Sequence, residues 1–331
     1  MKIKSLVLLL VITVPLAAFT LVAPPAAQAA RTWTLLGGGG TPDATVSLNA
    51  FYPRRVQIAV GDTITWQVFG FHNVAFTGGA KPPDFEIQQG TKRIANPAVA
   101  FPAGGKTYDG TGYVTSGVPQ DPSKPMTYSL TFTKAGTYSY LCIVHGPSMG
   151  GEVVVSDAAT GDPAKVLADA RQLQAAATKA GQEAWAATKP DQMGNAVNVP
   201  LIGSVKDGYS ILRFTRQPLV INRGTTVTWK MADPYEIHTV TFGSGAKPID
   251  YVTPEPQKQG PPLLVINPKI MTPTKTKTYA GTGFVNSGVL FPPGLPGNLP
   301  TSFSLTFTKA GTYRYYCSVH LPFMVGTVVV K

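Results

Sequence analysis

Short segments in which hydrophobic and polar residues alternate run through most of the chain, separated by glycine and proline. Residues 46–51 (VSLNAF), 55–60 (RVQIAV) and 63–68 (TITWQV) alternate with a period of two, as strands with one buried face do. The second half repeats this plan at 219–222 (LVIN) and 225–229 (TTVTW). The pattern predicts an all-β fold built from short strands and turns.

One segment, residues 157–194, departs from this alternation. It opens with Asp162-Pro163, a pair typical of a helix N-cap and first helical position. Residues 164–187 are rich in Ala, Lys, Gln, Leu and Glu, which are strong helix formers. We therefore expect one helix, ending near Lys189-Pro190, between two β domains. The apolar face expected to pack on one of these domains includes Val166, Leu167, Leu173 and Trp185.

The first thirty residues have the features of an export signal. Lys2 and Lys4 precede an apolar run at 6–23, and small residues in an Ala-x-Ala pattern follow at 27–29. This arrangement predicts a signal peptide at 1–30, and hence an extracytoplasmic protein, either periplasmic or at the cell surface. The alternative is that the segment is retained as a membrane anchor.

Length and composition agree with two β domains. A chain of 331 residues suggests about two domains, and 34 Gly and 30 Pro with only 14% charged residues favour sandwiches with many turns. The net charge of +11 would attract an acidic partner protein or an anionic membrane surface. The basic residues are scattered and form no basic helix, so no nucleic-acid partner is expected.

A Cys-x2-His-x3-Met motif occurs twice, at 142–149 and at 317–324. The ten residues SLTFTKAGTY precede both copies, at 129–138 and 304–313. These motifs hold both cysteines and two of the four histidines in the chain. The repeat predicts two similar domains, at residues 31–156 and 195–331.

A glycine-rich block is also repeated, as TYDGTGYVTSGV at 107–118 and TYAGTGFVNSGV at 278–289. A phosphate-binding loop would need a strand before the glycines and a helix after them, and no such context is present. Turn formation explains the glycines better. Because the block appears in both copies, we expect it to form a loop that supports each site.

The residue types indicate metal binding. Two imidazoles, a thiolate and a weak thioether form the ligand set of a blue-copper site, and period-two alternation turns each cysteine inward at the end of a strand. A disulfide between the two cysteines would break the symmetry of the repeat, and zinc gains little from a thioether. The candidate ligands of two copper ions are His72, Cys142, His145 and Met149 in the first copy and His238, Cys317, His320 and Met324 in the second.

These motifs resemble the cupredoxins, the family of plastocyanin, azurin, amicyanin and halocyanin, in both predicted domains. The resemblance implies two tandem Greek-key β-sandwiches, joined here by the α-helical linker, with one type 1 copper site in each. It also implies that Asn73, directly after His72, supports the thiolate loop. The second copy has Thr239 at this position, so we expect the surroundings of the two sites to differ.

The resemblance implies an electron-transfer protein that cycles between Cu(I) and Cu(II) and exchanges electrons with a redox partner protein. Electrons in cupredoxins usually pass through the exposed histidine of the late loop, here His145 and His320. The apolar residues 321–323 beside His320 then predict that the second domain docks the partner.

Other functions remain as alternatives. Two-domain copper nitrite reductases and small laccases need more histidines for further copper ions, and the four here are all assigned, so neither an enzyme nor a small-molecule substrate is expected. Copper binding or delivery without a role in a redox chain is a second hypothesis, although no exposed Met- or His-rich tract supports delivery. The third is a structural role in which one site has lost its function.

Overall fold

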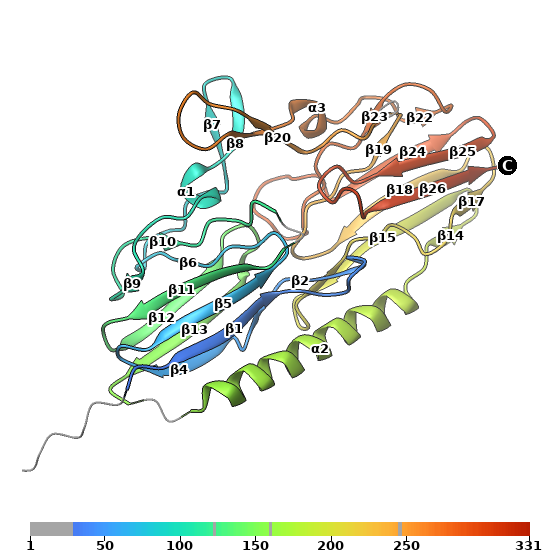
Figure 1. Ribbon diagram of the computed structural model, residues 1–331. Helices are drawn as coiled ribbons and strands as arrows, with labels where there is room; N and C mark the ends of the chain where they lie inside the picture. The colour runs from blue at the N-terminus through green and yellow to red at the C-terminus, as the bar shows by residue number, and fades with distance from the viewer. Residues whose placement is uncertain (1–28, 122–123, 159–160, 244–246) are drawn as a thin grey trace, which may run out of the picture.

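Two β-sandwiches and one long helix dominate the computed structural model, which describes residues 29–121, 124–158, 161–243 and 247–331 (Figure 1). The predicted all-β class, with two sandwiches and a helix between the halves, is confirmed. The predicted signal peptide lies outside the described residues except for Ala29 and Ala30. No helix in these described ranges is long and apolar enough to cross a bilayer.

The sandwich of the N-terminal half consists of two five-stranded sheets. The first has the order β3-β1-β5-β11-β9, formed by Phe51–Tyr52, Thr32–Gly38, Thr63–Phe69, Met126–Phe132 and Thr107–Tyr108. The second has the order β10-β6-β12-β13-β4, formed by Val114–Thr115, Ala75–Phe76, Gly136–Cys142, Gly146–Ser156 and Arg55–Ala59. Buried aromatic rings, among them Trp66, Phe76 and Tyr140, fill the space between the sheets.

The sandwich of the C-terminal half repeats this arrangement. One sheet has the order β2-β16-β15-β18-β24-β22, with β14 also paired to β15, formed by Val46–Leu48, Tyr209–Ile211, Ala196–Ser204, Thr226–Ala232, Ser302–Phe307, Thr278–Tyr279 and Asp191–Met193. The other has the order β17-β26-β25-β19-β23, formed by Leu219–Ile221, Val325–Val330, Gly311–Tyr316, Thr241–Phe242 and Val285–Asn286. Trp229, Phe242 and Tyr315 occupy the positions of the three N-terminal core rings.

Strands of the two halves also pair with each other. Strand β2 belongs to the N-terminal half by sequence, yet it pairs antiparallel with β16. A four-stranded sheet of order β20-β21-β8-β7 contains Val252–Glu255 and Leu263–Ile266 from one half and Lys92–Ala95 and Glu86–Gln89 from the other. Short helices α1 (Pro97–Ala100) and α3 (Pro268–Met271) follow β8 and β21. The domain boundaries at 31–156 and 195–331 stay a prediction, because these sheets cross them.

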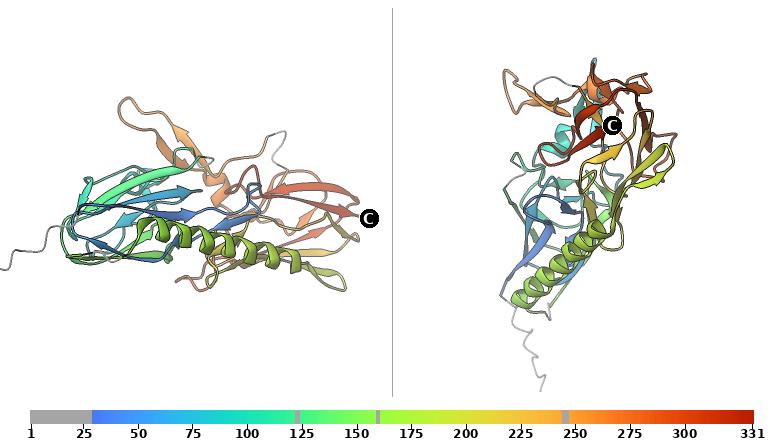
Figure 2. Two further views of the ribbon diagram at one scale, coloured as in Figure 1. Left: turned by 60° about the horizontal axis from the view of Figure 1, so that its bottom comes forward. Right: turned by 90° about the vertical axis from the view of Figure 1, so that its right-hand side faces the viewer.

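Helix α2 (Pro163–Ala187) lies along both sandwiches rather than one (Figure 2). It begins as predicted, with the Asp162 carboxylate accepting a hydrogen bond from the Ala164 N–H at 2.9 Å. Ala170, Ala177 and Gly181 are its buried residues, and they lie on one face at helical spacing.

The helix packs on a cluster that contains residues from both halves, so the expectation of packing on one domain is wrong. Leu36 and Val46 come from the N-terminal half, and Tyr209 and Ile211 from the C-terminal half. Val166, Leu167 and Trp185 are packed as expected.

Leu173 is 50% exposed, contrary to expectation. It lies about 120° around the helix from Leu167 and Trp185, and small residues, not long ones, form the buried face. Gly181 shows how close this contact is, because a Cβ there would lie 2.5 Å from a Val46 methyl carbon.

Candidate metal centres

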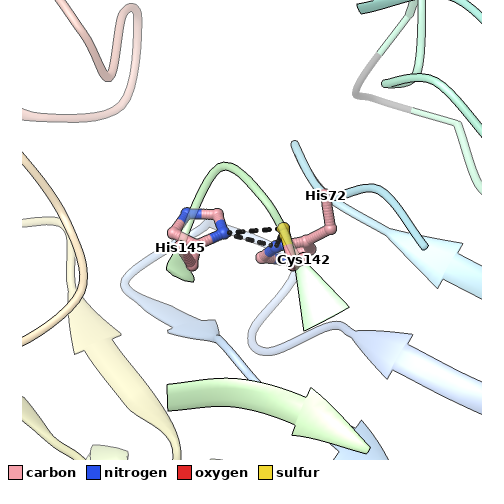
Figure 3. Close-up of side chains that lie close together, drawn as sticks. All are labelled: His72, Cys142 and His145. Carbon is pink, nitrogen blue, oxygen red and sulfur yellow. Dashed lines mark hydrogen bonds between the residues drawn. The ribbon is translucent and has the colours of Figure 1, made fainter. Parts of the chain in front are cut away.

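The N-terminal cluster brings two imidazole nitrogens to one thiol sulfur (Figure 3). Cys142 is the last residue of β12, and His145 follows in the turn to β13. The Cys142 Sγ lies 3.3 Å from His145 Nδ1 and 4.0 Å from His72 Nδ1. The two Nδ1 atoms are 3.0 Å apart. His72 lies in the loop between β5 and β6.

The C-terminal cluster has the same geometry. Cys317 directly follows β25, and its Sγ lies 3.5 Å from His320 Nδ1 and 3.9 Å from His238 Nδ1. His238 lies outside the named strands and forms an isolated bridge with Leu290. Both cysteines are buried and free, so the structure has no disulfide between them.

Each predicted methionine lies in the same core cluster as its cysteine. Met149 and Met324 are fully buried. The Met324 carbonyl accepts a hydrogen bond from the Cys317 N–H at 2.9 Å, and its N–H donates to the His320 carbonyl at 3.0 Å. The structure thus brings together three of the four predicted ligands in each half, and the predicted methionine lies in the same hydrophobic core.

The donor set fits a metal ion of copper size and softness. Metal–nitrogen and metal–sulfur bonds are about 2.0–2.3 Å long, so ligand atoms in a trigonal plane lie about 3.5–4 Å apart. The three donor atoms of each cluster lie within 4.8 Å of one another, and the sulfur–nitrogen distances of 3.3–4.0 Å match that spacing. Two imidazoles and one thiolate with a thioether nearby favour copper.

The electrostatics of both clusters favour the thiolate form that metals bind. Burial would raise the pKa of Cys142, but the adjoining His145 and His72 outweigh burial and lower this pKa to about 5. Burial would also raise the pKa of Cys317. The adjoining His320 and His238 outweigh burial and lower this pKa well below its usual value. Each thiol therefore loses its proton readily, as a metal-binding cysteine must.

Backbone amides hold each thiolate in place. The Asn73 N–H donates to Cys142 Sγ at 3.5 Å, and the Thr239 N–H donates to Cys317 Sγ at 3.3 Å. The Asn73 side-chain oxygen also accepts a hydrogen bond from the N–H of the residue after Cys142, at 2.8 Å. Thr239 Oγ1 accepts the equivalent bond from Ser318, also at 2.8 Å. Threonine thus replaces asparagine without loss of this bond.

The repeated glycine-rich blocks support the same loops. Ser116 of the first block accepts a hydrogen bond from the Val74 N–H at 2.9 Å, and Ser287 of the second accepts one from the Val240 N–H at 2.8 Å. The neighbouring residues differ, because Asn73 donates directly to Thr115 in the first half. The surroundings of the two sites therefore differ beyond the ligands, as expected.

The late-loop histidines are not exposed, which corrects the expectation that their rings lie at the surface. The side chains of His145 and His320 are 3% and 11% exposed. The carboxylate of Glu236 lies between them, with Oε1 3.2 Å from His145 Nε2 and Oε2 3.2 Å from His320 Nε2. The two clusters therefore face each other across the junction of the halves, and this junction covers both histidines.

The charges at this junction stabilise one another. Burial would raise the pKa of Glu236, but its contacts with His145 and His320 lower that pKa well below its usual value. Burial opposes a high pKa for both histidines, yet Glu236 and the nearby thiolates raise the pKa of each to about 10. The carboxylate is therefore an acceptor for both rings.

Glu236 and Asp233 lie at the two clusters but belong to no motif that the sequence shows. Asp233 is fully buried, and its Oδ2 lies 3.4 Å from His238 Nε2. Both acidic residues lie in the loop between a tryptophan and the upstream histidine. That interval is six positions in the first half (66 to 72) and nine in the second (229 to 238). The longer loop was visible in the sequence, but its partners were not.

The paired β-sheets and the buried His-Cys-His clusters with a methionine nearby define a copper protein of the cupredoxin class. The family model of copper-binding proteins of the plastocyanin/azurin family matches this chain at residues 43–156 and 298–331.

Amicyanin from Paracoccus denitrificans is 50% identical over 48 residues, which cover 14% of this chain and 36% of amicyanin, so the match spans about a third of that relative. Among solved structures, an oxidised amicyanin mutant is 22% identical, covering 43% of this chain and 92% of its own with a TM-score of 0.24. The Cu(I) form of another amicyanin mutant is 30% identical to this chain. The match covers 31% of this chain and 70% of the amicyanin chain, with a TM-score of 0.20.

Proposed function

We propose that the protein is an extracytoplasmic electron-transfer protein with one type 1 copper site in each half. The observation that carries this proposal is the convergence of two Nδ1 atoms on a buried thiolate in both halves. Copper bound there would supply the one-electron Cu(I)/Cu(II) couple. The proposed ligands are His72, Cys142, His145 and Met149 for one ion and His238, Cys317, His320 and Met324 for the other.

The protein groups around each site are suited to electron transfer because they are held in place before any electron arrives. The thiolates accept backbone hydrogen bonds, and the four sulfur atoms belong to fully buried residues. A packed interior resists displacement of its side chains. The ligands therefore keep similar positions in both oxidation states, which lowers the cost of each transfer.

The alternatives have less support. Copper delivery needs ligands that an acceptor protein can reach, and the side chains of His72 and His238, like those of both cysteines, are buried. A nitrite reductase or laccase needs further histidine ligands, and the four histidines of the chain all belong to the two clusters.

We propose that a redox partner protein supplies and removes the electrons. Because His145 and His320 are covered, their rings do not offer a direct contact. Phe323, beside His320 in the chain, is 45% exposed, so the apolar rim at 321–323 stays the predicted docking surface. Without Lys2 and Lys4 of the predicted signal peptide, the net charge is +9 (26 Lys and Arg minus 17 Asp and Glu), which would favour an acidic partner.

The visible spectrum tests this function. The chain from Arg31 onward is loaded with Cu(II), and copper per chain is measured beside the absorbance. An intense thiolate-to-copper band with two coppers per chain, bleached by a mild reductant and restored by an oxidant, is expected. A colourless protein that prefers zinc would contradict the proposal.

A further inference from the structure

The carboxylate of Glu236 lies between the two candidate copper sites and contacts one histidine of each. We propose that Glu236 joins the two sites into one electron-transfer unit, by accepting a hydrogen bond from His145 Nε2–H and from His320 Nε2–H at the same time. This inference rests on the proposed function, because it requires copper at both clusters.

The chemistry of the three groups fits this bridge. In both histidines Nδ1 faces the cysteine sulfur and Nε2 faces Glu236. A neutral imidazole whose Nδ1 binds a metal carries its proton on Nε2 and is a hydrogen-bond donor there. A carboxylate has two acceptor oxygens and no donor, and here each oxygen lies 3.2 Å from a different ring. The carboxylate can therefore satisfy both rings.

The loop that carries Glu236 is fixed on its own side by Asp233. One carboxylate oxygen of Asp233 accepts hydrogen bonds from the Tyr235 N–H at 2.9 Å, the Glu236 N–H at 3.2 Å and the Ser210 hydroxyl at 2.8 Å. Hydrogen bonds to a charged acceptor are stronger than those between neutral groups. The backbone at Glu236 is therefore held firmly in the C-terminal half.

The N-terminal half fixes the same loop from the opposite side. Tyr235, next to Glu236, is 5% exposed and belongs to the core cluster of the N-terminal half, with Trp33 and Phe51. Asn49 of that half donates to the Ser210 hydroxyl at 2.8 Å. Both halves therefore determine where the Glu236 carboxylate lies.

Further contacts join the two halves around this junction. Strand β2 pairs with β16, β8 pairs with β21, and helix α2 packs on both halves. The path between the sites therefore consists of two imidazole rings and one carboxylate, and it does not depend on a flexible linker.

The transfer through this path is a simple one-electron exchange. With copper held by both clusters, the exchange would move one electron from Cu(I) in one half to Cu(II) in the other, so that the two ions would swap oxidation states. Both protons stay on Nε2, and no bond is made or broken. The redox partner protein of the proposed function supplies the electron at one half, and an acceptor of the same class removes it from the other.

Glu236→Gln tests the bridge. The amide has one acceptor oxygen, and its NH2 group would face the other Nε2–H as a donor, so only one hydrogen bond can remain. The control is Glu152→Gln, which makes the same change at a carboxylate paired with Arg55. Both variants and the unaltered protein are loaded with copper, reduced halfway and studied by NMR at several protein concentrations.

Fast electron exchange within one molecule averages the Cu(I) and Cu(II) resonances of each half, and it does so at every protein concentration. We expect this averaging in the unaltered protein and in Glu152→Gln. In Glu236→Gln we expect the exchange rate to fall at least about tenfold, or about 1.4 kcal/mol in activation free energy. We also expect both midpoint potentials to rise, because a negative charge near both rings favours Cu(II).

Unchanged exchange and unchanged potentials in Glu236→Gln, with both sites still blue, would overturn the bridge but leave the proposed function intact. Absence of the thiolate-to-copper band in the unaltered protein would instead overturn the proposed function. Slower exchange together with a shift of both midpoint potentials in Glu236→Gln would support the bridge. A residue that only held the halves together would not shift both potentials.

A second measurement needs no variant. In the unaltered Cu(I) protein, the Nε2–H protons of His145 and His320 should give two slowly exchanging, downfield NMR signals, because both protons are buried and hydrogen-bonded. Rapid exchange of either proton with water would overturn the bridge even if Glu236→Gln did not fold.

Discussion

Replacing Tyr235 by alanine should weaken the protein at the junction of its halves. The ring comes from the C-terminal half by sequence but lies in the core of the N-terminal half, with 5% of its surface exposed. An aromatic side chain buries about 150–250 Å², which at about 25 cal/mol per Å² is worth about 4–6 kcal/mol. Aromatic-to-alanine changes in cores cost about 3–5 kcal/mol, and we expect a loss in that range.

Denaturant unfolding of the metal-free protein measures this loss. Tyr235→Phe is the matched control, because it keeps the ring and removes a hydroxyl whose hydrogen bond to the Val205 carbonyl is long, at 3.4 Å. We expect Tyr235→Phe to cost at most about 1 kcal/mol. A cost below about 1 kcal/mol for Tyr235→Ala, or equal costs for the two variants, would refute the reasoning that the ring holds the halves together.

Three other predictions concern the sites and the surface. Cys142→Ser and Cys317→Ser should each remove one copper per chain and its part of the thiolate absorbance, whereas an unchanged copper content would show that the affected cluster is not a site. Thr239→Val leaves one buried N–H without its acceptor, so it should cost about 1–3 kcal/mol in unfolding free energy and change the midpoint potential of the C-terminal site alone. Phe323→Glu should slow electron exchange with the redox partner more than Ser148→Glu in stopped-flow measurements, and equal effects would contradict docking at residues 321–323.

Much of the fold follows from local sequence patterns. Period-two alternation predicts the strands because successive side chains of a strand point to opposite faces, and β5 and β12 show that alternation in their burial. The Asp162-Pro163 signal predicts where helix α2 begins, because capping depends on adjacent residues alone. Which face of the helix packs, and against what, does not follow from such signals. The predicted burial of Leu173 and the predicted packing on a single half were both wrong.

The candidate copper ligands could be found in the sequence because three of the four in each half lie within eight residues and the motif occurs twice. The residue types and their order in the motif indicate the kind of metal that the site would bind. The remaining ligand, His72 or His238, could be assigned because the chain contains only four histidines.

Only the tertiary structure decided how the two sites are related. His145 and Glu236 are 91 residues apart, and Glu236 and His320 are 84 residues apart, so no local pattern links them. The first half by itself predicts an exposed His145, as in a single-domain cupredoxin. Docking of the halves buries this ring against a carboxylate from the other half, because the burial of a surface residue depends on what packs against it and not on its neighbours in the chain.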